Sequence, residues 1–158
     1  MKKKIKYYAI AIIIPLLVGG FSAFLTRNNM NIYDEINVPP FAPPSILFPI
    51  VWSVLYILMG ISSAMVFLSL DVDFSQRIKA LRYYVASLII NFLWNIIFFN
   101  LRSFMFSFIL LLFLLLLIIK TIYEYFKINK IAAYLQIPYA IWVTFAGVLN
   151  LAIWYLNR

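Results

Sequence analysis

The stretch that decides the fold is residues 109–119, which read ILLLFLLLLII without one polar side chain. It lies within a run of 17 uncharged residues between Arg102 and Lys120. A helix needs about 20 mostly apolar residues to cross a bilayer. A strand of a membrane barrel would alternate apolar and polar residues, and this stretch shows no alternation. We therefore predict a membrane-spanning helix here.

Four further apolar runs of similar length become visible when charged residues are used as boundaries. Together with the first they predict an all-α membrane protein, a single domain over residues 1–158 built as a bundle of five transmembrane helices. The expected spans are residues 6–26, 46–70, 80–101, 103–125 and 131–156. The connections are short except for residues 27–45, which form a long Pro-rich loop between the first two helices.

Composition agrees with this fold class and excludes several functions. Of the 158 residues, 66% are hydrophobic and 11% are charged, and the mean hydropathy is +0.99. A soluble domain carries about 25% charged residues, so a soluble globular protein is excluded. The absence of His and Cys removes disulfides, thiolate nucleophiles, imidazole bases and zinc sites. We expect no metal site and no covalently bound cofactor.

The net charge of +8 is read as an orientation signal rather than as a nucleic-acid surface. Numbering the flanks from the N-terminus places ten Lys and Arg on one side of the membrane and three on the other. The positive-inside rule then predicts a cytoplasmic N-terminus, an extracytoplasmic C-terminus and an extracytoplasmic 27–45 loop. The basic start and apolar run also resemble a signal peptide, but Pro15 in mid-run and the missing A-x-A site favour a retained helix.

The loop between the first two helices is unusually stiff. Its residues 39–44 contain four prolines, Pro39, Pro40, Pro43 and Pro44, which prevent an ordinary helix. The simplest interpretation is a connector. Two Pro-Pro pairs are stiffer than a connector needs, so we favour a lid over one end of the bundle.

Polar and aromatic residues interrupt the second and third spans at helical spacing. Trp52 and Tyr56 share a face, either as an interfacial aromatic belt or as part of a site. Asn91 and Asn95 share a face of the third span, and buried amides need hydrogen-bond partners. Interhelical hydrogen bonding by these amides is the simpler interpretation, and a polar patch in a ligand cavity is the functional one.

Glu124, among lysines at the end of the fourth span, is expected to be solvated.

The fifth span carries Pro138, Trp142, Ala146 and Asn150 at steps of four, along one slowly drifting stripe. A large indole beside small residues suits a flat apolar ligand, but it also suits two closely packed helices. A Leu-x5-Tyr-x2-Arg pattern at residues 149–158 matches a loose sterol-contact motif that is common by chance.

Taken together, these segments resemble the tryptophan-rich sensory protein family, also called the translocator protein or peripheral-type benzodiazepine receptor family (TspO/MBR). Three blocks carry the resemblance, over about residues 33–157. They are Tyr33 with Pro39-x-Phe41-x-Pro43-Pro44, Trp52 and Tyr56; Asn91-x-x-Trp94 with Phe98-Phe99; and Pro138-Tyr139-x-x-Trp142-x-x-Phe145-Ala146-x-x-Leu149-Asn150. The family usually has Lys-Pro-x-Trp-x-Pro-Pro in the loop. Here Val38 replaces the Lys and Phe41 the Trp, so recognition of a porphyrin carboxylate is in question.

The resemblance implies an often dimeric five-helix bundle whose cavity binds porphyrins, other tetrapyrroles and benzodiazepine-type ligands, and sterols in some members. It implies a sensing, transport or regulatory role, with protoporphyrin IX as a ligand. Carried over by position, the ligand-facing residues would be Tyr33, Pro43, Trp52, Tyr56, Phe98, Trp142 and Ala146, with Asn91, Trp94 and Asn150 supporting the pocket.

Two other functions stay open. One is light-dependent oxidative breakdown of protoporphyrin, in which Trp52 and Trp142 would be the catalytic residues. The other is a structural bundle that modulates partner membrane proteins. The tetrapyrrole hypothesis depends on Trp52 and Trp142 lining one shared hollow beneath the lid, because flat rings are held by stacking on aromatic side chains.

Overall fold

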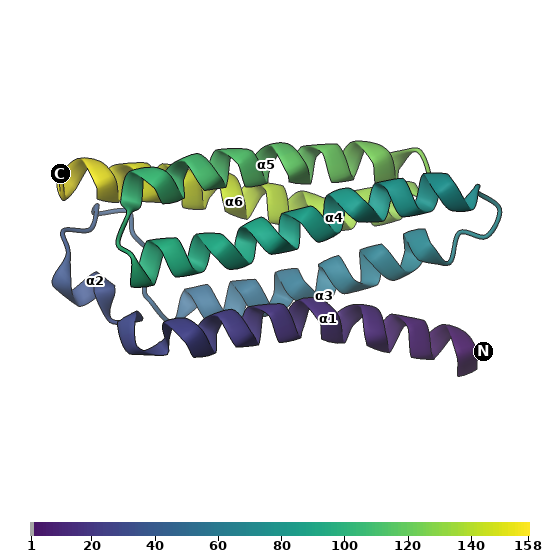
Figure 1. The fold of residues 1–158 in the computed structure, drawn as a ribbon, viewed down its shortest axis with the longest axis horizontal. Coiled ribbons are helices and arrows are strands. Elements are labelled where there is room, and N and C mark those ends of the chain that lie inside the picture. The colour runs from purple at the N-terminus through teal and green to yellow at the C-terminus, as the bar shows by residue number, and fades with distance from the viewer. Residues whose placement is uncertain (1) are drawn as a thin grey trace.

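The computed structural model describes residues 2–158, which form five long helices arranged as an elongated bundle (Figure 1). The long helices are α1 (Lys2–Thr26), α3 (Leu47–Phe67), α4 (Phe74–Asn95), α5 (Phe104–Phe126) and α6 (Lys130–Leu156). A 3₁₀ turn (Arg27–Asn29) and the short helix α2 (Ile32–Glu35) lie between α1 and α3. All five long helices are long and apolar enough to span a membrane, which confirms the predicted fold class.

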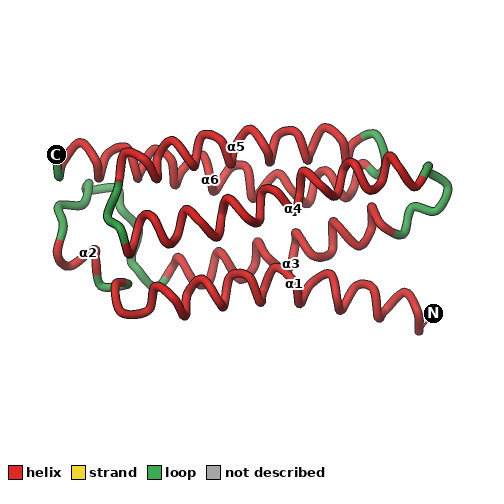
Figure 2. The backbone as a smooth tube through the Cα atoms, in the orientation of Figure 1, coloured by secondary structure: helices red, strands yellow, loops and turns green. Residues whose placement is uncertain are grey.

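The helices pack mainly in the pairs α5 with α6, α1 with α3, α4 with α5, and α3 with α6. Figure 1 shows the N-terminus and the α3–α4 and α5–α6 connections at one end of the bundle. The C-terminus, the α4–α5 connection and the segment containing α2 lie at the other end, here called the lid end (Figure 2). The ten-to-three division of basic residues therefore corresponds to the two ends of the bundle.

The helix α4 begins at Phe74, earlier than the expected position 80, because Asp73 caps it. The Asp73 carboxylate accepts a hydrogen bond from the Ser75 backbone N–H, the usual role of an N-cap residue. Arg77, on the first turn, is buried and donates to the carbonyls of Phe67 and Val72. One guanidinium thus satisfies carbonyls at the end of α3 and in the connection, and fixes how α3 turns into α4.

The residues of the expected lid do cross one end of the bundle, and part of the segment is helical (Figure 2). Ile32 of α2 is completely buried. Two hydrogen bonds join Asn157 to the backbone of Asn37. The Asn157 Oδ1 accepts from the Asn37 N–H at 2.9 Å, and the Asn157 Nδ2 donates to the Asn37 carbonyl at 2.8 Å. Arg102, in a left-handed conformation with φ of 50°, forms a 2.6 Å ion pair with Glu35. Polar contacts from α6 and the α4–α5 connection therefore hold the lid in place.

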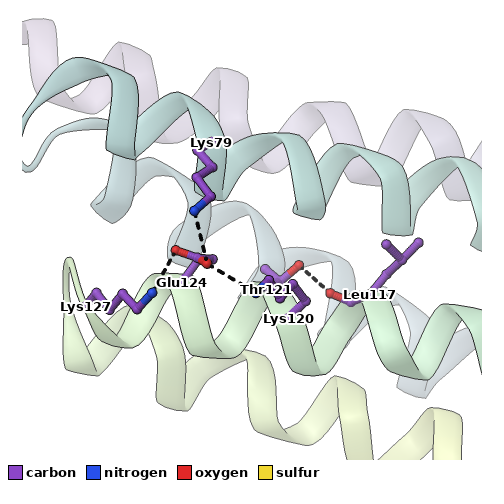
Figure 3. Close-up of polar contacts among 6 residues, drawn as sticks. All are labelled: Lys79, Leu117, Lys120, Thr121, Glu124 and Lys127. Carbon is purple, nitrogen blue, oxygen red and sulfur yellow. Dashed lines mark hydrogen bonds and ion pairs between the residues drawn. The ribbon is translucent and has the colours of Figure 1, made fainter.

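Glu124 is not solvated, contrary to the sequence-based expectation. It is 2% exposed and lies among three lysines, with N–O distances of 3.6 Å to Lys79, 3.5 Å to Lys120 and 3.4 Å to Lys127 (Figure 3). Lys79 comes from α4, Glu124 and Lys120 from α5, and Lys127 directly follows α5. The Glu124 carboxylate lowers the repulsion among the three positive charges at the α4–α5 contact.

We expect Glu124→Gln to destabilise the bundle by about 1–2 kcal/mol, because three lysines would then surround a neutral amide. The measurement is chemical unfolding in mixed micelles at low and at high salt. High salt should reduce the difference in the free energy of unfolding between the variant and the wild type. Glu35→Gln is the matched control, since the exposed Glu35–Arg102 pair should contribute less than about 0.5 kcal/mol. Equal effects of the two substitutions would contradict this account of Glu124.

Candidate ligand cavity

The central feature of the site is an aromatic stripe on α3, formed by Phe48, Trp52 and Tyr56 at steps of four residues, which places them on one helix face. Trp52 stacks on Tyr56 with ring centroids 5.6 Å apart and an interplanar angle of 27°. Its centroid lies 6.5 Å from that of Trp94 on α4. Tyr139 of α6 meets Trp52 edge-on at 6.1 Å. Indole and phenol faces from three helices therefore gather around Trp52.

A hollow of about 240 Å³, here called the inner cavity, lies beside this cluster between α1, α3, α4 and the lid segment. Its aromatic wall consists of Tyr33, Phe48, Trp52, Tyr56, Trp94 and Phe99. The opposite wall is α1, which passes directly over the Tyr56 ring: a Cβ on Gly19 would lie 2.2 Å from that ring. Close passage of this helix requires glycine at position 19.

The polar groups of the inner cavity are few and uncharged. Ser22 is among the lining residues, and its hydroxyl is buried without a hydrogen-bond partner among the described residues. The Tyr56 hydroxyl accepts a 3.3 Å hydrogen bond from the amide of Asn91, and Asn95 contributes to the wall. Among residues 2–158 no cluster of three or more Asp or Glu side chains could hold a metal. The site can therefore bind by stacking and by a small number of neutral hydrogen bonds.

Asn150 joins three helices next to the site. Its Oδ1 accepts from the Trp94 indole N–H at 3.1 Å and from the Ser107 hydroxyl at 2.9 Å, while its Nδ2 donates to the Phe104 carbonyl at 2.8 Å. This one amide on α6 therefore fixes the Trp94 ring on α4 and the first turn of α5. In the structure Asn150 is therefore an interhelical link between α4, α5 and α6.

A second space, here called the small gap, separates the inner cavity from α6. It has a volume of about 10 Å³ and is lined by Tyr33, Phe48, Trp94, Phe98, Ala146, Leu149, Asn150 and Ile153. Tyr33, Phe48 and Trp94 line the inner cavity as well. The Phe48 ring lies 5.5 Å from that of Tyr33 and 5.8 Å from that of Trp142. Phe48 thus lies, with Tyr33 and Trp94, between the inner cavity and the α6 side of the bundle.

The structure corrects the expectation that Trp52 and Trp142 line one hollow. Trp52 lines the inner cavity, whereas Trp142 lines a groove on the outer surface between α3 and α6, with residues such as Val54 and Ile141. The cause is the direction in which each helix face points, which sequence spacing does not determine. Within residues 2–158, Pro43 and Asn91 line neither the inner cavity nor the small gap nor this groove.

The structure therefore brings Tyr33, Trp52, Tyr56 and Trp94 together at the inner cavity and Phe98, Ala146 and Asn150 at the adjoining small gap. Sequence reasoning missed Phe48, although its place four residues before Trp52 was a usable signal. It also missed Ser22, because a single hydroxyl in an apolar first helix has no distinctive pattern. The ligand-binding roles of all these residues stay predictions.

Comparison with known proteins gives a family match. The model of the TspO/MBR family matches residues 11–156. The chain is 36% identical to the protein CrtK of Rhodobacter capsulatus over 125 residues, which cover 79% of this chain and 78% of that protein. It is 34% identical to the tryptophan-rich protein TspO of Archaeoglobus fulgidus, covering 94% and 95% of the two chains. It is 29% identical to the translocator protein of Bos taurus, covering 92% and 87%.

Proposed function

Because this chain belongs to the TspO/MBR family and is an integral membrane protein, we propose that it binds planar aromatic ligands of the tetrapyrrole class in the inner cavity, in a sensing, transport or regulatory role. Because Trp142 lies outside the inner cavity, the proposal no longer rests on a hollow shared by Trp52 and Trp142. The observation that carries it is the wall of Trp52, Tyr56 and Trp94, whose rings gather at one hollow. A tetrapyrrole is flat and apolar at its centre, and such rings stack on it or meet it edge-on.

The volume of the inner cavity adds a condition to this proposal. Small-molecule pockets usually measure about 300–1,000 Å³, and the inner cavity, at about 240 Å³, is smaller. A tetrapyrrole therefore requires the cavity to open. Tyr33, Phe48 and Trp94 line both the inner cavity and the small gap. Trp94 is held by its hydrogen bond to Asn150, so we propose that displacement of Phe48 joins the two spaces. Such opening would bring Phe98 and Ala146 into the ligand-binding wall.

The loop of this chain changes how a porphyrin would be recognised. Val38 is 39% exposed and stands where the family usually has Lys, so it supplies no cation for a propionate. We propose that recognition rests on the ring faces rather than on the carboxylates. The same proposal includes benzodiazepine-type aromatic ligands, which need only the stacking surface. We also propose that the protein assembles as a homodimer.

We expect Trp52→Phe to weaken protoporphyrin IX binding about three- to tenfold, because the smaller ring loses part of the stacking surface. The measurement is saturable quenching of porphyrin fluorescence by the detergent-purified protein in darkness. Trp154→Phe is the matched control, since that indole lies at the end of α6 beside Arg158, and it should change the affinity less than about twofold. If the wild-type protein shows no saturable quenching, the tetrapyrrole proposal is contradicted and the structural bundle is the remaining function. A new absorbance band formed only in light and lost in Trp52→Phe would favour porphyrin breakdown.

We expect Phe48→Ala to have the opposite effect on affinity from Trp52→Phe, and to strengthen protoporphyrin IX binding about fivefold. If Phe48 must be displaced before the ligand enters, its removal eliminates that conformational step, which lowers the apparent Kd. Phe145→Ala is the control, because Phe145 packs on Trp142 from the outer groove and should leave the affinity unchanged. Weaker binding by Phe48→Ala would show that Phe48 is a ligand contact and not a partition.

We also propose the orientation predicted from charge, in a bacterial cell membrane with the lid end outside. In this Cys-free chain, Val38→Cys on the lid segment should react with an impermeant maleimide added to intact cells. Ser75→Cys, exposed at the start of α4, should react only after lysis. The reverse pattern would overturn the orientation while leaving the bundle unaffected.

A further inference from the structure

Three lysines at the end of the bundle opposite the lid gather around one carboxylate, and the proposed function does not use them. They are Lys79 on α4, Lys120 on α5 and Lys127 just after α5, and Figure 3 shows them converging on Glu124. These four residues are here called the lysine cluster. Three positive charges stand against one negative charge, so the lysine cluster keeps a net charge of +2.

The hydrogen-bond donors of the lysine cluster are largely unused. Lys127 donates a hydrogen bond to Oε2 of Glu124 at 3.4 Å. Oε1 of Glu124, which faces Lys79 and Lys120, accepts no hydrogen bond from any residue in the described part of the chain. The three lysine side chains are 57%, 45% and 40% exposed in chain order. Each ammonium group has three N–H donors, so donors remain available to a ligand that approaches from outside the bundle.

Two tyrosine rings border the lysine cluster. The Nζ of Lys120 lies 5.7 Å from the ring centroid of Tyr83 and 5.2 Å from that of Tyr123. The Nζ of Lys127 lies 4.1 Å from the Tyr123 centroid. An ammonium group at these distances is attracted to the ring face. The rings therefore help to keep two of the lysine head groups close together before any ligand binds.

The lysine cluster lies at the level of the lipid head groups. The 17 uncharged residues between Arg102 and Lys120 have a length of about 25 Å as a helix, and the hydrocarbon core of a bilayer is about 30 Å thick. Lys120 therefore marks the edge of the hydrocarbon. Lys79, on the second turn of α4, and Lys127, after the end of α5, lie on the water side of this edge.

An exposed apolar stripe on α5 leads from the lysine cluster into the membrane. Leu116 and Leu112 precede Lys120 by four and eight residues, so they share its helix face. Their side chains are 64% and 48% exposed. Because α5 is long enough to span the membrane, this stripe contacts acyl chains. A molecule that matches both parts has a negative head group and an apolar tail.

From the charge, the level and the apolar stripe we propose that the lysine cluster is a binding site for an anionic phospholipid. The phosphate oxygens accept hydrogen bonds from Lys79 and Lys120, whose donors Glu124 leaves unused, and the acyl chains lie along Leu116 and Leu112. A zwitterionic phospholipid gains less, because its ammonium group would be repelled by the lysines. The proposal does not depend on tetrapyrrole binding, which concerns residues at the inner cavity.

The probe for this site is phosphatidylglycerol, with phosphatidylcholine of the same acyl chains as the matched neutral lipid. The full-length protein in a neutral detergent is titrated with each lipid, and bound lipids are counted by native mass spectrometry. We expect the first phosphatidylglycerol to bind about thirtyfold more tightly than phosphatidylcholine at low salt, since each of the two uncompensated charges contributes about fivefold. High salt should reduce this preference.

Two variants with opposite expected effects test the role of charge. Lys120→Gln should weaken phosphatidylglycerol binding about fivefold. Lys6→Gln is the matched control, because Lys6 is an exposed lysine at the same end of the bundle, and it should change the affinity less than about twofold. Glu124→Gln raises the net charge of the cluster to +3 and should tighten phosphatidylglycerol binding about fivefold, although it destabilises the bundle in neutral micelles. A solely structural role of Glu124 does not predict tighter binding.

The proposal is overturned if the two lipids bind alike, if Lys6→Gln weakens binding as much as Lys120→Gln, or if Glu124→Gln weakens it. Displacement of phosphatidylglycerol by an equal concentration of inorganic phosphate would identify a site for free anions and would also overturn the proposal. Thermal unfolding of each variant checks that the bundle is intact. Because porphyrin quenching is a separate measurement, loss of tetrapyrrole binding would leave this result readable, and the reverse also holds.

Discussion

The structure depends on one amide. In hydrocarbon a polar group has no water to bind, so each must find its partner inside the bundle. Asn150 meets this requirement with three hydrogen bonds, to the Trp94 indole, the Ser107 hydroxyl and the Phe104 carbonyl. These partners lie on α4 and at the start of α5, so the amide sets the rotation of three helices at once. It therefore also sets which face of Trp94 is directed at the inner cavity.

The interactions that fix the wall of the inner cavity differ from those that hold the lid over it. Trp94 is fixed by a buried hydrogen bond, whereas the lid is held through Asn157, Asn37, Glu35 and Arg102, which lie at an exposed end of the bundle. Exposed polar contacts contribute little to stability, often less than about 1 kcal/mol. The wall is thus fixed by a buried hydrogen bond, whereas the cover combines exposed polar contacts with the buried side chain of Ile32.

The five spans and the lid segment could be predicted because their signals are local: run length, charged boundaries and prolines. The sequence could not show that Trp52 and Trp142 line separate spaces, because helix rotation is set by tertiary contacts such as those of Asn150. It could not show that Glu124 is buried either, since Lys79 approaches from another helix. Phe48 could have been found from its spacing to Trp52, but its position between the inner cavity and the α6 side is visible only against Tyr33 and Trp142.

The same physical rule distinguishes the polar groups that link helices from those that do not. Asn150 sits where helices meet and every hydrogen-bonding atom of its amide that faces the protein is used, so it holds helices together. Ser22 of α1 is as deeply buried, but its hydroxyl has no partner among the described residues. In a medium that offers no water, Ser22 therefore adds no link between helices, and α1 is fitted to the bundle by its close passage over Tyr56 at Gly19.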